Sequence, residues 1–196
     1  SGIVHRRFGY DNVGFHMGSD MITIDFSGEL SMEELRQVEL AANEAIWQNF
    51  PTKIFYPDAE TLASLPYRSK KALSGAVRLV QFGSVDLCAC CGLHVARTGE
   101  IGLIKLLSTT RFHSGSRVEL LCGKRALEYL NVICGQNREI SALLSAKPVQ
   151  TAAAVERMKK ELSDTQYRVG ALEGQLFAYK AKAMENASDV LLFEEA

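Results

Sequence analysis

The spacing of apolar positions changes several times along the first 147 residues, and each spacing predicts an element. Apolar–polar alternation between turn residues predicts strands at 13–17, 21–26, 53–56, 77–82, 102–108 and 116–122. Helical spacing predicts the end of an amphipathic helix at 1–10, helices at 31–50 and 123–144, and a short helix or turn at 58–65. Ser31 and Glu34 form the sequence signature of a capping box at the start of one of these helices. This mixture predicts an α+β domain.

The C-terminal part of the chain has a different repeat. From residue 155 onward apolar residues recur every seven positions, with a second row offset by three: Val155, Leu162, Val169, Leu176 and Ala183, then Met158, Leu172 and Tyr179. This spacing predicts a coiled coil or a long paired helix, although Gly170 and Gly174 weaken it. The alternative is a single amphipathic helix lying on the domain. Because Pro148 marks a break, the expected division is a domain at 1–147 and a helical arm at 148–196, through which a homodimer could form.

The charge of the chain is small in total but unevenly distributed. The net charge of the 196 residues is -1, with 47% hydrophobic and 23% charged residues, which excludes a disordered chain and a basic protein that coats nucleic acid. Residues 20–60 hold nine acidic and two basic side chains, whereas residues 61–125 hold ten basic and three acidic ones. The basic part can attract phosphate groups. Alternatively, the two halves pair with each other across a sheet.

Cysteine usage and hydropathy bear on the compartment. Three of the five cysteines are Cys88, Cys90 and Cys91, a clustering that favours a reducing compartment, such as the cytoplasm, over a secreted disulfide framework. No apolar run approaches the roughly 18 residues that span a bilayer, and the first residues lack the charge order of a signal peptide. We therefore expect a cytoplasmic protein with no membrane partner, whose thiols are available for metal binding or chemistry.

Cys90 and His94 are the residues most suggestive of chemistry. Their spacing of four can place a thiolate and an imidazole on one zinc ion, but two ligands do not complete a site. A buried structural cysteine beside a hydrogen-bonded histidine is an alternative. A Cys/His nucleophile pair with Asp86 orienting the imidazole is another.

Several motifs, in the same order along the chain, resemble the signature of the alanyl-tRNA editing family, which comprises the editing domain of alanyl-tRNA synthetase and the free-standing AlaX proteins. The longest motif runs from Cys90 through Gly92-Leu-His94-Val to Thr98-Gly-Glu-Ile-Gly102. Three shorter stretches also match: Gly14-Phe-His-Met-Gly18 with Thr23-Ile-Asp-Phe26, Gly115-x-Arg117-Val-Glu119, and Gly123-x-Arg125-Ala-Leu127. The resemblance covers most of residues 1–145. It implies an antiparallel sheet packed with helices, as in the editing domains of threonyl- and alanyl-tRNA synthetases, followed by a long helical arm.

The sequence also departs from the family pattern. Members of the family hold zinc with an H-x-x-x-H helix and a C-x-x-x-H pair, of which this sequence keeps only Cys90 and His94. The family places H-x-x-x-H just ahead of the segment that matches Ser1, so we expect the other two ligands, and the start of that helix, upstream. Leu93 replaces a threonine that is usual in the family. The arm resembles the helix that leads into a DHH-associated domain in longer AlaX proteins, and that domain is also missing from the sequence.

The resemblance implies zinc-dependent hydrolysis of alanine tRNA that carries a wrong small amino acid, serine or glycine. His16, Thr23 and Asp25 are the expected pocket-lining catalytic candidates. Cys90 and His94 are the expected metal ligands. Arg97, Lys105 and Arg125 are candidates for contacts with the tRNA backbone near the acceptor end. The competing hypothesis is a non-catalytic tRNA-binding or dimerisation module with a degenerate metal site.

Overall fold

The computed structural model describes residues 1–69 and 75–184. Contacts along the chain divide it into two units, Ser1–Asn131 and Val132–Ala196. Among the described residues, the first unit contains two antiparallel sheets with their helices, and the second is helical. The predicted α+β class is confirmed.

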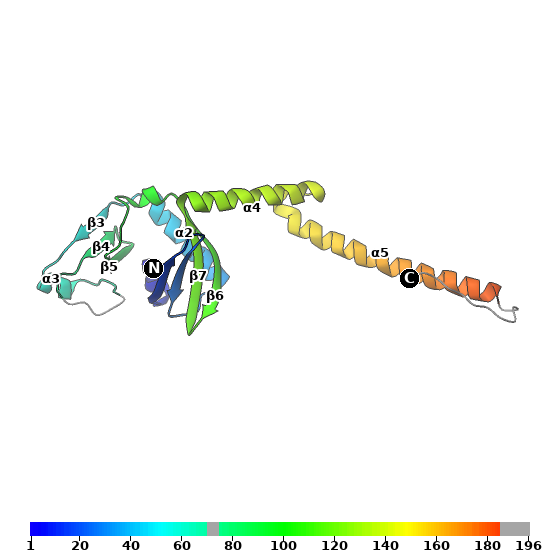
Figure 1. The fold of residues 1–196 in the computed structure, drawn as a ribbon, viewed down its shortest axis with the longest axis horizontal. Helices are drawn as coiled ribbons and strands as arrows, with labels where there is room; N and C mark the ends of the chain where they lie inside the picture. Colours follow the sequence, from blue (N-terminus) through cyan, green and yellow to red (C-terminus); the bar gives the residue numbers. More distant parts are fainter. Residues whose placement is uncertain (70–74, 185–196) are drawn as a thin grey trace. The chain divides into compact units, whose positions relative to one another are not determined.

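A four-stranded antiparallel sheet forms the centre of the first unit (Figure 1). Its strands are β1 (Asn12–Met17), β2 (Ile22–Phe26), β6 (Ile104–Phe112) and β7 (Gly115–Cys122), in the order β1-β2-β7-β6. Two hairpins, β1–β2 and β6–β7, thus meet where β2 pairs with β7. A register shift between Leu106 and Ser108 marks a bulge in β6.

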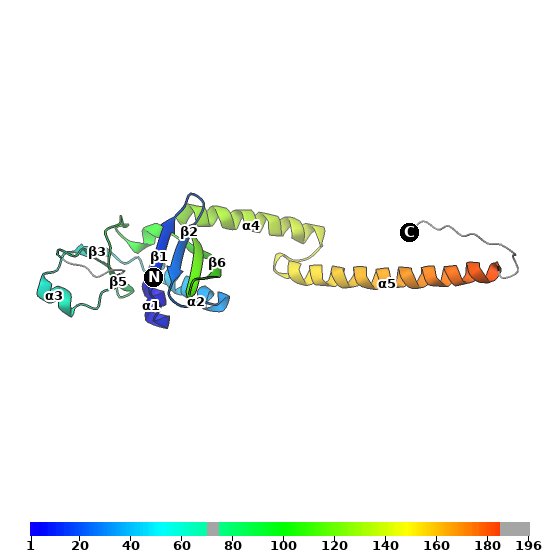
Figure 2. The ribbon, with the colours of Figure 1, turned by 60° about the horizontal axis from the view of Figure 1, so that its bottom comes forward.

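Helix α2 (Met32–Trp47) packs on one face of this sheet, as Figure 2 shows. Its capping box is present: the Ser31 hydroxyl accepts from the Glu34 N–H, and the Glu34 carboxylate accepts from the Ser31 N–H. Leu35 and Val38 are buried on the helix face that meets the sheet, whose inward side chains include Phe26. Successive residues of a strand alternate between the two faces, so Thr23 and Asp25 lie on the opposite face from Phe26.

Helix α1 (Gly2–Phe8) completes the main core. Val4 is buried there against the strands and α2, and the helix also contacts β5. Gly9 ends α1 in a left-handed conformation with φ 72°. The predicted helix within residues 1–10 and its C-terminal stop at Gly9 are therefore confirmed.

A smaller sheet extends from the end of α2 and consists of β3 (Thr52–Phe55), β4 (Leu79–Phe82) and β5 (Asp86–Ala89), in that order. Arg68 adds a parallel bridge to Cys88 on the outer side of β5. A short helix, α3 (Ala59–Ser64), follows β3 and is capped by Asp58. The 3₁₀ turn η1 (Thr98–Ile101) leads the chain back to β6.

The second unit begins within α4 (Gly123–Leu143) and continues through the 3₁₀ turn η2 (Pro148–Gln150) into α5 (Thr151–Ala183). Asn137 ties the two helices together locally, because its amide donates to the Pro148 carbonyl and its carbonyl accepts from the Thr151 hydroxyl. The apolar heptad side chains of α5 are largely exposed, among them Leu162, Val169, Leu172, Leu176 and Tyr179. In the part of the chain that the structure describes, each helix is too short or too polar to cross a membrane.

The elements match the sequence predictions with a few differences. The predicted strand at 102–108 begins at Ile104 and continues to Phe112, and the strand at 77–82 is confined to Leu79–Phe82. Strand β5 and turn η1 were not predicted. The arm is helical where it is described, whereas residues 185–196 lie outside the described residues. Pairing of the arm and the domain boundary near residue 147 stay predictions.

Candidate functional site in the loop after β5

Cys90 and His94 lie in one loop, residues 90–97, that directly follows β5. The Cys90 Sγ accepts a hydrogen bond from the Gly92 N–H at 3.4 Å, which folds the loop back on itself. The imidazole ring of His94 lies 5.7 Å from the ring of Phe82 at the end of β4, between centroids. Leu93, between these groups, is fully exposed. The small sheet thus presents the thiol and the imidazole on a short loop.

The His94 imidazole is held in a partly desolvated position. Burial is the main cause that lowers the pKa of His94, and the nearby Arg78 guanidinium lowers it further. The Gly92 backbone offsets part of this shift, although the buried Nδ1 atom has no partner in hydrogen-bond geometry among the described residues. A buried, unpartnered ring nitrogen is unusual and is the kind of atom that a metal ion or a ligand can satisfy.

The far end of the loop is fixed to the end of α2. The Thr98 hydroxyl donates to the Ala45 carbonyl at 2.9 Å and accepts from the Phe50 N–H at 2.9 Å, and the Thr98 N–H donates to the Phe50 carbonyl at 2.9 Å. Next to it, the Gly99 N–H donates to the Asn49 side-chain oxygen at 3.2 Å. We call these contacts of Asn49 and Phe50 with Thr98 and Gly99 the clasp. The Thr98-Gly-Glu motif therefore holds the loop against α2.

His16, Thr23 and Asp25 are brought to the face of the large sheet that is opposite α2. His16 pairs directly with Thr23 across β1 and β2, so their side chains lie next to each other on one face. Asp25 is buried, and its two oxygens accept from Arg117 Nε at 2.7 Å and Nη2 at 2.9 Å. The Asp25 carboxylate is thus engaged in a bidentate ion pair across the β2–β7 ladder.

Glycine at position 14 makes room for this ion pair. A Cβ atom there would lie 2.3 Å from an oxygen of Asp25, a distance that real Cβ atoms do not show. The Arg117 guanidinium also lies 3.7 Å from the centre of the Phe112 ring. The Gly14-Phe-His-Met stretch thus provides the space for Asp25 as well as the position of His16.

Arg97, Lys105 and Arg125 lie at three different places, each with a contact inside the protein. Arg97 donates to the Asn49 carbonyl at 2.7 Å. Lys105 forms an ion pair with Glu39 of α2 at 2.8 Å. Arg125 donates to the Gly18 carbonyl in the β1–β2 turn at 3.3 Å. Whether any of them also contacts tRNA stays a prediction.

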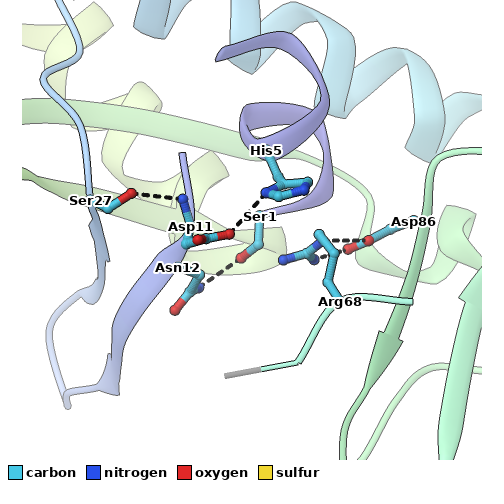
Figure 3. Close-up of polar contacts among 7 residues, drawn as sticks. All are labelled: Ser1, His5, Asp11, Asn12, Ser27, Arg68 and Asp86. Carbon is cyan, nitrogen blue, oxygen red and sulfur yellow. Dashed lines mark hydrogen bonds and ion pairs between the residues drawn. The ribbon is translucent and has the colours of Figure 1, made fainter. Parts of the chain in front are cut away.

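A cluster of polar side chains connects α1 with β1 and β5 (Figure 3). Arg68 and Asp86 form a mostly buried ion pair through both carboxylate oxygens. Gly2 packs so closely on Asp86 that a Cβ atom there would lie 2.2 Å from its Cγ. Three residues further along α1, His5 Nδ1 lies 3.0 Å from Asp11 Oδ1. These contacts fix β5, and with it the start of the loop at residue 90, against α1.

Cys90 and His94 offer two of the donors that zinc prefers, a thiol and an imidazole. Within residues 1–69 and 75–184, no group of three or more His, Cys, Asp or Glu side chains is placed to hold a metal ion. The donor chemistry of the loop therefore fits part of a zinc site. Asp86, considered as an orienting residue for His94, is instead paired with Arg68.

The chain is similar in sequence to several known proteins. Residues 77–119, which run from the approach to β4 through the loop and into β7, match the threonyl and alanyl tRNA synthetase second additional domain. Over 193 residues, 94% of this chain, the sequence is 28% identical to the alanyl-tRNA editing protein AlaX-L of Pyrococcus horikoshii. Over most of its length the chain is therefore similar to the alanyl-tRNA editing proteins. It is also 31% identical over 173 residues, 84% of the chain, to an alanine--tRNA ligase of Oceanobacillus iheyensis.

The match spans only part of these relatives of the editing family. It covers 46% of the AlaX-L protein and 19% of the Oceanobacillus ligase. An alanine--tRNA ligase of Methanothermobacter thermautotrophicus gives a similar picture, with 28% identity over 87% of this chain and 20% of the ligase.

Arg78 and Asn49, which hold the loop after β5 in place, were not predicted from the sequence, and Thr98 was part of a motif without an assigned contact. Arg78 donates to loop carbonyls, and Asn49 and Thr98 form the clasp. Asn49 adopts φ 53°, and an asparagine that ends a helix just before a Phe-Pro pair is a recognisable signal for this left-handed conformation. Arg78 carries no such signal, because an arginine beside a strand is ordinarily a solvated charge.

Proposed function

We propose that this chain is the editing part of a protein that hydrolyses mischarged alanine tRNA and releases serine or glycine. The observation that carries the proposal is the loop after β5, where the half-buried Cys90 thiol and the unpartnered His94 ring nitrogen occur together in a chain similar to the alanyl-tRNA editing proteins. The ester that joins an amino acid to tRNA is already activated, so its hydrolysis needs mainly the positioning of the acceptor end and of a water molecule.

In this proposal Cys90 and His94 supply two zinc ligands, and the H-x-x-x-H helix that the resemblance places ahead of Ser1 supplies the others. Zinc would polarise the ester carbonyl or lower the pKa of a water molecule. His16 and Thr23 offer an adjacent imidazole and hydroxyl for hydrogen bonds to the substrate, while Arg117 holds the Asp25 carboxylate in place by two hydrogen bonds. Arg97, Lys105 and Arg125 remain candidates for contacts with the tRNA backbone.

The test uses the complete open reading frame that contains this chain, purified and supplied with alanine tRNA charged with serine. We expect serine release, and Cys90→Ser and His94→Asn should each reduce it at least about tenfold. Cys134→Ser is the matched control, because Cys134 is an exposed cysteine on α4. Release by the unsubstituted protein that does not exceed the uncatalysed rate would reject the proposal, and so would full activity of both loop variants.

A second proposal concerns α5, whose apolar heptad positions are exposed over several turns. We propose that this arm pairs with the arm of a second copy, because burying two such rows against each other removes apolar surface from water. This role would remain if the metal site were degenerate, leaving a non-catalytic module that binds tRNA or dimerises. Sedimentation of the full chain should give a dimer, and a chain ending at Pro148 should give monomers. A dimer that persists after this truncation would exclude α5 as the interface.

A further inference from the structure

Arg78 lies immediately before β4, and its guanidinium reaches across to the loop after β5. The Nη1 atom donates to the Cys90 carbonyl and, at 3.2 Å, to the Gly92 carbonyl. The backbone of Arg78 holds the same segment, because its carbonyl accepts from the Cys90 N–H at 3.2 Å. One residue thus contacts the loop on both sides of Cys91, at the carbonyls of Cys90 and Gly92.

These contacts restrict the part of the loop that determines where the two candidate ligands lie. A guanidinium is planar and always charged, and hydrogen bonds from it to carbonyl oxygens are stronger than those between neutral groups. With the carbonyls of Cys90 and Gly92 fixed, the Gly92 N–H is directed at the Cys90 Sγ. His94 follows two residues later, with its imidazole close to the same guanidinium.

The other end of the loop is held independently by the clasp, so the loop is fixed at each end by a different set of groups. The clasp uses hydroxyl, amide and backbone groups at the end of α2, whereas the start of the loop is held by one backbone hydrogen bond and by the side chain of Arg78. Loss of Arg78 should therefore release residues 90–94 without unfolding the sheet beneath them.

We infer that Arg78 is a positioning residue of the proposed deacylase site, whose guanidinium holds the Cys90 and Gly92 carbonyls and thereby presents the Cys90 thiol and the His94 imidazole. The inference rests on the proposed function for its catalytic consequence, but the positioning itself can be measured without activity. Arg78 does not act on the substrate in this account; it acts through the loop.

The experiment compares Arg78→Met, which removes the charge and the N–H donors, with Arg78→Lys, which keeps the charge but lacks the planar guanidinium group. Arg111→Met is the matched control, because Arg111 is an exposed arginine of β6 whose ion pair is with Glu29, at 3.4 Å, and not with the loop. The first measurement is hydrogen exchange of the amides of residues 91–96, relative to those of β4, in the complete open reading frame. Arg78→Met should speed loop exchange by about tenfold or more while β4 stays protected. Arg78→Lys should lie between Arg78→Met and the unsubstituted protein.

The second measurement is serine release from mischarged alanine tRNA. Arg78→Met should reduce kcat by about 10- to 100-fold with little change in KM, because the loop positions reacting groups and does not bind the body of the tRNA. Millimolar guanidinium chloride should restore part of this kcat and of the loop protection in Arg78→Ala. A merely structural contribution of Arg78 to stability would instead increase exchange in β4 as well and would not respond to guanidinium.

The outcomes separate the two proposals. Loop exchange in both Arg78→Met and Arg78→Lys that matches Arg111→Met would overturn the role of Arg78, and so would an unchanged kcat in an active protein. Faster loop exchange in a protein that releases no serine even when unsubstituted would overturn the proposed function while supporting the positioning of the loop by Arg78. If Arg78→Met fails to fold, the loop exchange of Arg78→Lys, which preserves the charge, decides the role of Arg78 by itself.

Discussion

Asn49 and Gly99, fifty residues apart in the sequence, are in direct contact: the Gly99 N–H donates to the Asn49 side-chain oxygen at 3.2 Å, and a Cβ atom on residue 99 would lie 2.6 Å from that oxygen. The pair joins the end of α2 to the end of the loop that carries Cys90 and His94. The glycine of the Thr98-Gly-Glu motif is therefore required by this close approach.

Gly99→Ala should lower the free energy of unfolding of the first unit by about 1–3 kcal/mol, because the new methyl group overlaps the Asn49 side chain. Urea unfolding followed by circular dichroism measures the change. In an Asn49→Ala background the same substitution should cost less, since the overlapping atoms are gone. Gly135→Ala in α4 is the matched control, with nothing within 4 Å of the added Cβ atom. An equal loss in both backgrounds would contradict the contact.

Gly14→Ala should displace Asp25 from Arg117, because the added Cβ atom would occupy the position of a carboxylate oxygen. We expect a lower midpoint of thermal unfolding and a lower pKa of Arg117, whose pKa is raised chiefly by its hydrogen bond with Asp25. Nitrogen-detected NMR of the Arg117 guanidinium reports the loss of the pair directly. Gly174→Ala, on exposed α5, is the control and should leave this signal unchanged. An unshifted Arg117 signal in Gly14→Ala would show that Asp25 can accommodate a methyl group at residue 14.

Glu34 should titrate at a lower pH than an ordinary glutamate. The Ser31 N–H, and next the Ser31 hydroxyl, donate to its carboxylate and lower its pKa. A lowered folded-state pKa means that the stabilisation is present above the ordinary value of 4.5 and is lost as the pH falls through the lowered pKa. Carbon-detected NMR titration should show this shift, and Ser31→Ala should reverse part of it.

Removing the same cap should also weaken α2 at neutral pH. Ser31→Ala should cost about 1 kcal/mol of stability, the usual value for an N-cap serine. A variant with unchanged stability would show that the core contacts of α2 hold the helix start without its cap.

The five cysteines should differ in their rates of alkylation when a chelator is present. Burial raises the pKa of the Cys88 thiol to about 11, from an ordinary 9.0, and also raises the pKa of Cys122. At pH 8 Cys88 should therefore carry about a hundredfold less thiolate than an unperturbed cysteine. Iodoacetamide labelling followed by mass spectrometry should modify the exposed Cys91 and Cys134 first. Early modification of Cys88 would contradict the burial that raises its pKa.

The parts of the fold that were predictable from the sequence are those with strong local signals. The capping box fixed the start of α2, and apolar alternation located the strands of the large sheet. Strand β5 was missed because Asp86-Leu-Cys-Ala89 lacks alternation and β-branched residues; it is a strand because β4 and Arg68 pair with it on either side. Tertiary pairing of this kind is not contained in a local pattern.

The candidate site shows the same limit. Spacing and family resemblance selected Cys90 and His94, and the structure places both in one loop. The roles of Lys105 and Asp25 depend on Glu39 and Arg117, which are distant in sequence, so that no spacing rule could indicate their ion pairs. The Arg78 contacts could not be predicted from the sequence either, because Arg78 donates to backbone carbonyls, which every residue has.

The clasp joins the two ends of the chain segment that forms the small sheet. Asn49 follows the end of α2, and the chain then forms the small sheet before Thr98 returns to contact the end of α2. The residues between Asn49 and Thr98 therefore form a closed loop whose two ends are joined by the clasp. The entropy of closing a ring rises only with the logarithm of its length, about 0.6 kcal/mol per doubling. A change in the length of the connection between β3 and β4 should therefore have little effect on the stability of the clasp. The relative positions of Cys90 and His94 should then be unaffected by insertions or deletions in that connection.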